Sequence, residues 1–365
     1  MRRSAFDIAV IGGGPAGAAS AILLASASLS VLLLESSDYA GSSIGQTLPP
    51  KIDRQLARLG VLPQFLGQAY TPAPGIVSVW GSPQPFVTDF LFGVHGSGWQ
   101  IDRLAFDRML AKSAEKAGAT VQLGSRMLSA PRRDREGWVF EFASQGTRSE
   151  CRCRFLIDAT GRSGTSWLSS LSPRVVMDKL IGVAWTGKQS AEWLYTLVES
   201  VDDGWFYCAN LPGERATVVY MTDSDLYRHG CRQFPDLWWR QLSKTTCARE
   251  RIPRGVDVSK PVILSAASIA RLNPVGKGWC AVGDAAMSYD PLSGLGVYYA
   301  MESAYQAAAA VLQYLQDGKP LNSYRNWVAK MVHYNLVARQ HYYATERRWP
   351  SSLFWQRRCC PPPVR

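Results

Sequence analysis

Three glycines near the start of the chain have a spacing that suits the binding of a phosphate group. Gly12, Gly14 and Gly17 form a G-x-G-x-x-G pattern. The pattern directly follows the apolar run Ile8–Ile11, which predicts a strand buried on both faces. The first glycine allows a tight turn, the second lets the backbone approach a pyrophosphate, and the third lets helix and strand pack closely. The N–H groups that begin the next helix would face the phosphates.

An acidic residue at the end of the next strand completes this pattern. Leu32–Leu34 predict a second strand, and Glu35 follows it, 18 residues after Gly17, where a carboxylate accepts hydrogen bonds from a ribose hydroxyl. A glycine-rich loop alone occurs in many α/β proteins. Here strand, glycine turn, helix, strand and acid occur together and in order, so the stretch predicts a domain that binds a dinucleotide cofactor.

The same stretch has some features of a secretory signal peptide. Arg2 and Arg3 precede an apolar stretch that ends in small residues. However, Asp7 and the run Gly12–Ala16 interrupt the apolar stretch, and cleavage near Ala25 would remove the phosphate turn. We therefore expect a cytoplasmic protein. No apolar run is long enough for a transmembrane segment, so none is expected.

Composition and charge limit the class of protein further. With 365 residues, of which 47% are hydrophobic, the chain can bury a large core and form two lobes. The eight cysteines and four histidines lack metal-site spacing, so we expect reduced thiols and no metal. The net charge of +11 comes from dispersed basic residues without a nucleic-acid recognition pattern. We expect no nucleic-acid partner, and the charge slightly favours an acidic one.

Strands of the buried type recur along the chain, which indicates a discontinuous domain. The runs from Phe155 to Gly161 and from Trp279 to Ala286 repeat the pattern of the first strand. Residues 171–270 instead alternate as in an antiparallel sheet. We predict an α/β fold in which a Rossmann-type domain carries an inserted antiparallel-sheet substrate domain. The expected parts are 1–170 (first part of the dinucleotide-binding domain, with an inserted segment at about 60–100), 171–270 (substrate domain), 271–320 (return of the first domain) and 321–365 (helical basic tail).

Two further motifs carry an acid or a glycine turn at the end of a strand. Asp158-Ala-Thr-Gly161 ends a buried strand with a turn that a ligand can approach closely. Gly283-Asp284 ends another, and Asp290-Pro-Leu-Ser-Gly-Leu-Gly296 then opens a helix. An acid followed by a glycine turn at a helix start suits ribityl hydroxyls and a second bound anion.

These three motifs, in their order and spacing, resemble the FAD motifs of a flavoprotein superfamily. It includes p-hydroxybenzoate-hydroxylase-type monooxygenases, geranylgeranyl reductases and flavin-dependent tryptophan halogenases. The resemblance implies a p-hydroxybenzoate-hydroxylase-like fold and non-covalent FAD. Arg103 matches an arginine that approaches the cofactor in the family. The alternative interpretation is an ordinary arginine on the surface of a helix. The residues implied in cofactor binding are Gly12, Gly14, Pro15, Ala16, Gly17, Glu35, Arg103, Asp158, Gly161, Gly283, Asp284, Pro291, Gly294, Leu295 and Gly296.

Two other stretches are similar to one subgroup of that superfamily. Gly45-Gln-Thr-Leu-Pro-Pro50 resembles its Gly-Glu-Ser/Thr-Leu-Pro-Pro segment, and the stretch 345–358 resembles its tail. The subgroup comprises flavoproteins that mature cysteine tryptophylquinone-dependent amino-acid and amine oxidases by acting on a tryptophan of the oxidase precursor. The resemblance implies a protein substrate. Gln46 stands where the subgroup usually has Glu, which weakens any transfer of a catalytic role to this position.

The expected chemistry belongs to the flavin, because no Ser-His-Asp signature, Walker motif or metal cluster occurs. A second dinucleotide-binding unit is also missing, so electrons would come from transiently bound NAD(P)H, a partner reductase or the substrate. Catalytic side chains stay unassigned, with Pro291 and Gln46 as candidates. The candidate pocket walls are Trp185, Trp205, Tyr207 and Tyr220, with Leu292 on the flavin side. The alternative interpretation is that these aromatic side chains only pack in the core.

Three functions remain open. The first is an FAD-dependent monooxygenase that oxygenates a tryptophan of an oxidase precursor. The second is an FAD-dependent hydroxylase or reductase of a small aromatic or isoprenoid metabolite, and the third is a flavin-binding assembly factor for an oxidase. Halogenation is disfavoured, because the Trp-x-Trp-x-Ile-Pro segment is absent and Lys51 does not match the lysine context of halogenases. The basic tail, with Arg347, Arg348 and Arg357-Arg358, is interpreted as a docking element or an inward-packed cap.

Overall fold

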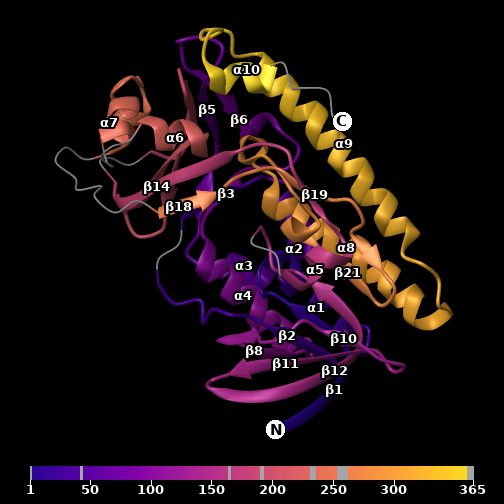
Figure 1. Ribbon diagram of the computed structural model, residues 1–365. Helices are drawn as coiled ribbons and strands as arrows, with labels where there is room; N and C mark the ends of the chain where they lie inside the picture. Colours follow the sequence, from indigo (N-terminus) through magenta and orange to yellow (C-terminus); the bar gives the residue numbers. More distant parts are fainter. Residues whose placement is uncertain are drawn as a thin grey trace.

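The computed structural model describes residues 2–41, 44–162, 166–189, 193–230, 236–252 and 262–359. Two sheets stacked one above the other dominate the molecule, and the chain begins at the lower one (Figure 1). The lower sheet and its helices form an α/β layer. The upper sheet has seven strands among the described residues, against nine in the lower sheet, and is mainly antiparallel. This is the expected arrangement of a Rossmann-type domain combined with a substrate domain.

The lower sheet pairs its central strands in parallel, as the buried apolar runs predict. The central order is β12-β1-β2-β8, with β21 parallel to β12 on the other side. β2 is buried along its whole length. The sheet comprises, among the described residues, β1 (Arg2–Ile11), β2 (Val31–Leu34), β8 (Thr120–Gln122), β9 (Ser125–Met127), β10 (Arg132–Arg133), β11 (Trp138–Ser144), β12 (Thr147–Asp158), β20 (Val275–Gly276) and β21 (Trp279–Ala281).

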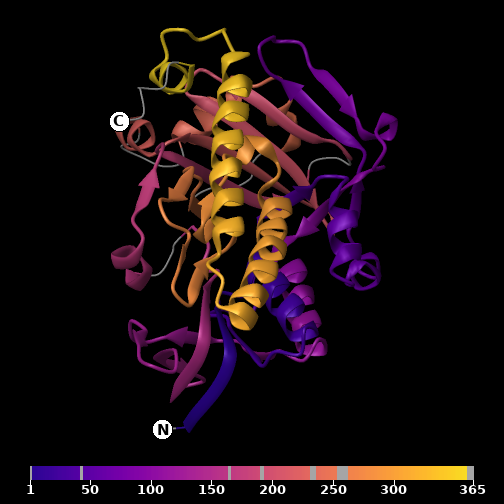
Figure 2. The same cartoon turned by 90° about the vertical axis from the view of Figure 1, so that its right-hand side faces the viewer.

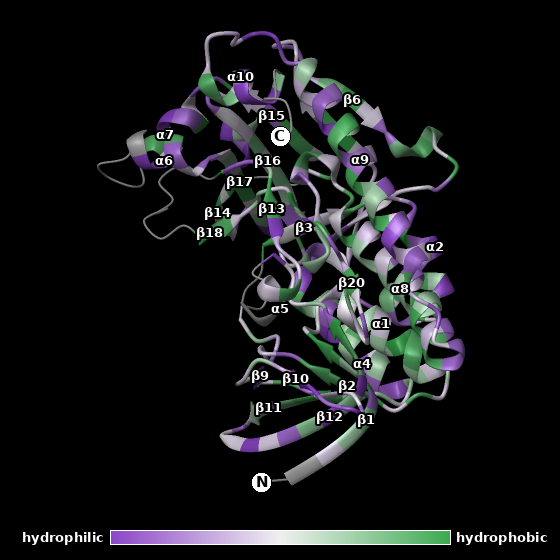
Figure 3. Ribbon diagram, turned by 45° about the vertical axis from the view of Figure 1, so that its right-hand side comes forward, coloured by the Kyte–Doolittle hydropathy of each residue, from purple (hydrophilic) through white to green (hydrophobic). Residues whose placement is uncertain are grey.

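Helices α1, α4 and α8 pack beside this sheet and complete its core. α1 begins at Pro15, directly after the glycine turn, and α4 begins after Asp102, whose side chain accepts a hydrogen bond from the Ala105 N–H. Figure 3 shows the hydrophobic residues gathered where these helices meet the strands. The helices are α1 (Pro15–Ser26), α2 (Ile52–Arg58), α3 (Leu62–Leu66), α4 (Arg103–Lys116), α5 (Ser166–Leu171), α6 (Ser224–Gly230), α7 (Asp236–Ser243), α8 (Gly296–Asp317), α9 (Asn322–Ala344) and α10 (Leu353–Cys359), with 3₁₀ turns η1 (Phe90–Phe92), η2 (Ala248–Arg251), η3 (Gly283–Ala285) and η4 (Pro291–Ser293).

The upper sheet recruits strands from two distant parts of the chain. Its order is β18-β14-β17-β16-β15-β5-β6, and β5 pairs with β15 in parallel whereas the other neighbours are antiparallel. The segment at about 60–100, expected to belong to the dinucleotide-binding domain, therefore contributes two strands to the sheet of the substrate domain. The substrate domain is thus not confined to residues 171–270, the range that the sequence predicts. The strands are β5 (Gly75–Val79), β6 (Phe86–Asp89), β14 (Leu180–Lys188), β15 (Thr196–Val201), β16 (Gly204–Leu211), β17 (Arg215–Asp223) and β18 (Val262–Ser265).

Two small sheets join the layers. Each has three strands in the described part of the chain. One holds the Gly45–Leu48 strand against β7, and the other carries the strand that precedes the Asp290 turn. Their strands are β3 (Gly45–Leu48), β4 (Thr71–Ala73) and β7 (Gly98–Asp102), and β13 (Arg174–Val176), β19 (Ile269–Arg271) and β22 (Met287–Ser288).

Alternation along the strands of the upper sheet separates its side chains onto two faces. Trp205 and Tyr207 point to the lower layer, with Val219 and Met221 of the neighbouring strand. Phe206 and its neighbours face the other way. They pack with Trp238 of α7 in a separate core that also contains Val183, Trp185, Val218 and Tyr220.

The C-terminal region is an inward-packed cap, one of the two expected alternatives. Figure 2 shows α9 running along the length of the molecule, with α10 folded back at its upper end. Tyr343, Phe354 and Trp355 are almost completely buried against the upper sheet. Arg357 and Arg358 bind acids of β17 and α6 instead of forming a free basic surface: the pairs are Arg357–Asp223, Arg357–Asp225 and Arg358–Asp223.

No helix in the described ranges is long and apolar enough to cross a membrane.

Candidate active site

A cavity of about 850 Å³ lies between the two layers and brings together most of the residues singled out from the sequence. It extends from the glycine turn, past α4 and the Asp290–Gly296 turn, to the upper sheet. Its volume is in the upper part of the range of cofactor sites, which runs from about 300 to 1,000 Å³. The predicted residues that line it are Gly12, Gly14, Pro15, Ala16, Glu35, Gln46, Arg103, Gly161, Trp205, Tyr207, Asp284, Pro291, Leu292, Gly294, Leu295 and Gly296.

The glycine turn forms an open cradle at the N-terminus of α1. Gly12 has a φ of +108°, and a Cβ there would lie 2.3 Å from the Ala159 carbonyl oxygen. At Gly14, which caps α1 with an extended backbone, a Cβ would have no protein atom within 4 Å. Gly14 thus faces the cavity, next to the N–H groups that begin α1. A helix N-terminus in such an open cradle fits a pyrophosphate.

Glu35 lies at the end of β2, where the sequence pattern placed it. One carboxylate oxygen accepts a 2.6 Å hydrogen bond from the Gly13 N–H, and the other accepts one of 2.7 Å from the Ser37 N–H. Tyr39 donates to the Gly13 carbonyl oxygen at 2.8 Å. Glu35 and Tyr39 therefore fix the conformation of the glycine turn, and Glu35 also lines the cavity.

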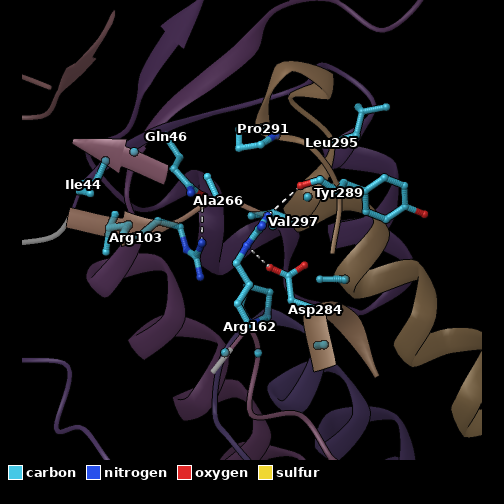
Figure 4. Close-up of a pocket in the computed structure, with 18 of the residues that line it drawn as sticks. Ile44, Gln46, Arg103, Arg162, Ala266, Asp284, Tyr289, Pro291, Leu295 and Val297 are labelled. Atoms are coloured by element: carbon cyan, nitrogen blue, oxygen red, sulfur yellow. Dashed lines mark hydrogen bonds and ion pairs between the residues drawn. The ribbon is translucent and has the colours of Figure 1, made fainter. Parts of the chain in front are cut away.

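Arg103 begins α4 and points into the cavity rather than to the surface. Its guanidinium group binds Asp107 through two hydrogen bonds, of 3.2 and 2.8 Å. It donates a third, of 2.9 Å, to Oε1 of Gln46 (Figure 4). Burial raises the pKa of Asp107, although the Arg103 charge opposes the shift. Gln46 therefore acts as a hydrogen-bond acceptor that orients Arg103.

Asp284 is held by an arginine that the sequence analysis did not single out. Arg162 contacts a carboxylate oxygen of Asp284 at 3.0 Å. The same guanidinium group donates to the carbonyl oxygen of Tyr289 at 2.8 Å (Figure 4). It also donates to the carbonyl oxygen of Ala267 at 2.7 Å. Arg162 directly follows Gly161 in the sequence. Its position beside a glycine turn that faces the ligand was the signal that could have identified it as a site residue. It links the middle motif to the third one.

The Asp290–Gly296 turn forms the part of the cavity wall nearest the upper sheet. The Asp290 side chain accepts a 3.0 Å hydrogen bond from the Leu292 N–H and so caps η4. Gly294 has a φ of +61°, which favours glycine. A Cβ at Gly296, the first residue of α8, would have no protein atom within 4 Å. The start of α8 therefore faces open space in the cavity.

Asp290 is itself buried and paired with residues of α9. Arg339 lies 3.3 Å from Asp290 and 3.2 Å from Asp178, and Tyr343 donates to Asp290 at 3.1 Å. Burial raises the pKa of the Asp290 carboxyl group, and the charge of Arg339 counteracts this effect. These α9 residues carried no motif that sequence reasoning could have recognised.

The upper sheet supplies two aromatic side chains to the cavity wall, Trp205 and Tyr207. The Trp205 indole N–H donates to the Tyr343 hydroxyl at 3.1 Å. The Tyr207 hydroxyl donates to Oγ1 of Thr47 at 3.1 Å and accepts from the Thr47 N–H at 2.9 Å. Burial raises the pKa of Tyr207 to about 12, so this hydroxyl stays protonated at neutral pH. Their hydrogen bonds therefore hold both Trp205 and Tyr207 in place along the cavity wall.

Trp185 and Tyr220, proposed as pocket walls, do not line the cavity. They lie on the opposite face of the upper sheet, packed with Phe206. The reason is the two-residue period of a strand: Trp205 and Tyr207 share a face, and neighbouring strands present Trp185 and Tyr220 to the other one. The sequence could not fix which of the two faces meets the cofactor domain.

Three residues assigned to cofactor binding serve packing instead of lining the cavity. A Cβ at Gly17 would lie 1.9 Å from the Gly12 carbonyl oxygen, in keeping with the close helix–strand packing expected of it. A Cβ at Gly283 would lie 2.6 Å from that of Ala16. Asp158 is fully buried, 3.4 Å from Arg271, and accepts two hydrogen bonds from Thr160, so it stabilises the end of β12.

The charged residues of the described cavity wall are acids and arginines, and none of them is lysine. Lys51 lies outside the cavity wall, with its ammonium group 4.2 Å from the centre of the Tyr298 ring. Among the described residues, no group of histidine, cysteine, aspartate and glutamate side chains could hold a metal ion. The donors at this site suit an anionic organic ligand.

Comparison with known proteins agrees with this geometry. Residues 5–333 match the model of the FAD_binding_3 family, described as an FAD binding domain. LodB of Marinomonas mediterranea, named as an FAD-dependent oxidoreductase, is 33% identical over 97% of this chain and 96% of its own length. The chain therefore belongs to the FAD_binding_3 family. It is an FAD-dependent oxidoreductase, and its cofactor is FAD.

Solved structures share the fold over almost the whole chain. The myxobacterial chondrochloren halogenase CndH superposes with a TM-score of 0.86 at 22% identity, covering 97% of this chain and 86% of that one. The peptidyl tryptophan dihydroxylase QhpG, described as essential for tryptophylquinone cofactor biogenesis, has a TM-score of 0.80 at 23% identity, covering 99% of this chain and 80% of its own. These likenesses establish the fold class.

Proposed function

We propose that the cavity holds FAD along its length, from the glycine turn to the Asp290–Gly296 turn. Gly14 and the start of α1 would receive the pyrophosphate, with Glu35 near the adenosine ribose and Asp284 near the ribityl chain. Gly296, at the start of α8, would receive the flavin ring. N–H groups at a helix start stabilise the negative charge that a reduced flavin carries, which is the role proposed for this turn.

The reaction proposed is monooxygenation of a tryptophan side chain in a protein, an oxidase precursor in cysteine tryptophylquinone biogenesis. One oxygen atom of O₂ bonds to a carbon of the indole ring, so that C–H becomes C–OH. The other oxygen atom is reduced to water. Two electrons and two protons complete the balance, supplied by NAD(P)H or a partner reductase. FAD supplies the activation of oxygen when it is bound. The chain's own residues bind and orient the ring and exclude water.

The observation that carries this proposal is the pair of aromatic side chains in the cavity wall. Trp205 and Tyr207 line the cavity together with Pro291 and Leu292. The polar tips of the two aromatic rings are held by hydrogen bonds to Tyr343 and Thr47. Aromatic side chains favour offset or edge-on contact with another aromatic ring, so this wall suits an indole. The likeness to a peptidyl tryptophan dihydroxylase supports the same substrate class.

Gln46 is proposed as a positioning residue, because its amide contacts Arg103 and carries no proton that can ionise near neutral pH. Pro291 remains a candidate for shaping the space beside the flavin ring. A second candidate function, halogenation, is favoured by the fold likeness to CndH. The described cavity wall lacks the lysine expected of such an enzyme, which argues for oxygenation.

The experiment uses the FAD-loaded protein and a co-expressed precursor of a quinone-dependent oxidase. Peptide mass spectrometry should show oxygen added to a precursor tryptophan, and only when this protein is present. In parallel, anaerobic reduction of the flavin by NADPH is followed with and without the precursor. An unmodified precursor, together with rapid turnover of a free small aromatic compound, would favour the metabolite hydroxylase. Tight binding without turnover of either would favour the assembly factor.

A further inference from the structure

The four most exposed large hydrophobic side chains of the described residues lie in the segment 86–94, at the edge of the upper sheet, and Val87 of the same segment is also exposed. Leu91, Phe92 and Val94 are 72%, 93% and 94% exposed. Phe86 and Val87, on β6, are 68% and 52% exposed. We call Phe86, Val87, Leu91, Phe92 and Val94 the apolar rim. Soluble proteins rarely expose apolar side chains in such a group unless the surface binds a partner.

The rim leads directly into the cavity. Phe90, which lies between its two halves, lines the cavity wall. Thr88 of β6 pairs with Ile76 of β5, and Ile76 pairs with Thr196 of β15; Ile76 and Thr196 both line the cavity. The hairpin of β5 and β6 lies at the margin of the molecule (Figure 2). A segment bound at the rim can therefore send a side chain past Phe90.

The outer edge of β6 offers backbone hydrogen bonds as well. Among the described strands, β6 pairs only with β5. Edge strands are normally protected by being short or by charged side chains, proline or bulges. β6 is short, with four residues, and Pro85 precedes it, but Phe86–Asp89 itself contains no lysine or proline. Its one charge, Asp89, is already engaged by the Tyr195 hydroxyl at 3.0 Å and the Leu91 N–H at 2.8 Å. The edge is thus apolar and able to pair with an added strand.

We infer that the apolar rim and the outer edge of β6 bind an extended, uncharged apolar segment of the protein substrate as an added strand. Backbone pairing and apolar contacts would hold the segment, while the residue to be oxidised enters the cavity beside Phe90. The inference rests on the proposed function and names how its substrate docks. It replaces the basic tail as the docking element, because Arg348, Arg357 and Arg358 are occupied by internal ion pairs.

The test measures binding of a fluorescein-labelled peptide of alternating valine and threonine residues with one terminal tryptophan. Fluorescence anisotropy gives its Kd for the FAD-loaded protein. Phe92→Asp/Val94→Asp should weaken binding about ten-fold or more. The matched control is Val176→Asp/Leu272→Asp, whose positions are 61% and 63% exposed and lie outside the cavity wall. The control should bind as the wild type does.

A second peptide carries N-methyl groups at alternate amides, which block strand pairing but keep the side chains. It should bind much more weakly than the first. Equal binding of the two peptides, no binding by the wild type, or unchanged affinity in the rim variant would each overturn the inference. A wild-type dimer that dissociates in the rim variant, with peptide affinity unchanged, would assign the rim to a second copy of the chain.

Oxygenation of the peptide is measured separately, so the two proposals fail in different ways. Weak binding by the rim variant, with no oxidation of tryptophan by either protein, would contradict the proposed reaction and leave the docking surface in place. Equal oxidation by wild type and rim variant at limiting peptide would contradict the docking surface and leave the reaction in place.

Discussion

The Tyr343 hydroxyl group donates a 3.1 Å hydrogen bond to a carboxylate oxygen of Asp290. The same hydroxyl accepts the indole N–H of Trp205 at 3.1 Å. One side chain of α9 therefore links two parts of the cavity wall: the turn that precedes α8 and the aromatic side chains of the upper sheet. All three residues are buried, so water cannot replace these bonds readily.

Tyr343→Phe should loosen both walls without creating a cavity. The change leaves the Trp205 N–H without its acceptor and removes one donor from Asp290. We expect a loss of about 1–3 kcal/mol in the free energy of unfolding. Turnover should fall more than flavin content, because the walls lose alignment whereas the glycine turn is untouched. Urea unfolding and the ratio of bound flavin to protein test this. Wild-type stability and turnover would contradict the link.

Gly14→Val should abolish flavin binding while the protein still folds. A Cβ at Gly14 meets no protein atom within 4 Å, so the added side chain projects into the cavity where we propose the pyrophosphate. The free energy of unfolding of the flavin-free protein should change by less than about 1 kcal/mol. Gly12→Ala is the contrasting variant. Its Cβ would lie 2.3 Å from a carbonyl oxygen at a φ of +108°, so it should destabilise the fold itself. A yellow, FAD-loaded Gly14→Val protein would overturn the placement.

Gln46→Glu tests whether this position takes part in the chemistry. The new carboxylate would meet the Arg103 guanidinium group, now 2.9 Å from the amide oxygen, and would stay ionised at neutral pH. Flavin content and kcat between about pH 6 and pH 9 should therefore change little. General acid–base groups contribute about 10²-fold or more to a rate. A change of that size in kcat would mean that this position acts in proton transfer rather than in orienting Arg103.

The anchoring of the C-terminal cap should weaken in acid. Hydrogen bonds from Arg357 and Lys179 hold the pKa of Asp225 well below its ordinary value. A carboxyl group with a lowered folded-state pKa stabilises the fold above its unfolded pKa of about 3.9, and the stabilisation is lost as pH falls through the folded-state value. Asp225→Asn should cost about 1 kcal/mol or less at pH 7.

The cost of Asp225→Asn should shrink as the pH is lowered below about 4. Urea unfolding of wild type and variant across this range measures it. Asp317→Asn, which removes a surface carboxylate paired with Lys319, is the matched control. A cost that is independent of pH would show that Asp225 contributes by packing alone.

The lower layer of the fold could be predicted because its signals are local. The glycine turn, the apolar run of β1 and Glu35 lie within one continuous stretch, and their order together selects the dinucleotide-binding interpretation over the alternatives. Arg103 and Gln46 could be named from motifs, but their mutual contact depends on the pairing of β3 with β7. The sequence indicated which residues matter and could not indicate which of them meet.

The upper sheet shows what the sequence left open. Alternation in β16 places Trp205 and Tyr207 on one face of the strand and Phe206 on the other. No pattern in the neighbouring sequence indicates which face meets the cofactor domain. The prediction that Trp185 and Tyr220 line the pocket is therefore wrong. The recruitment of β5 depends on pairing with β15, more than a hundred positions further along the chain. The role of Tyr343 depends on contacts with Asp290 and Trp205, which lie 53 and 138 positions before it. Such long-range pairing leaves no local pattern.

Labelled dioxygen tests most directly the proposed oxygenation of a protein-bound tryptophan. The FAD-loaded protein is incubated with the precursor, NADPH and heavy-isotope dioxygen, and the tryptophan-containing peptide is analysed by tandem mass spectrometry. We predict that a labelled oxygen atom is fixed to the indole ring, and that label is absent from the precursor when Gly14→Val replaces the wild type. Unlabelled tryptophan, alongside label in a free aromatic compound offered in competition, would contradict the account.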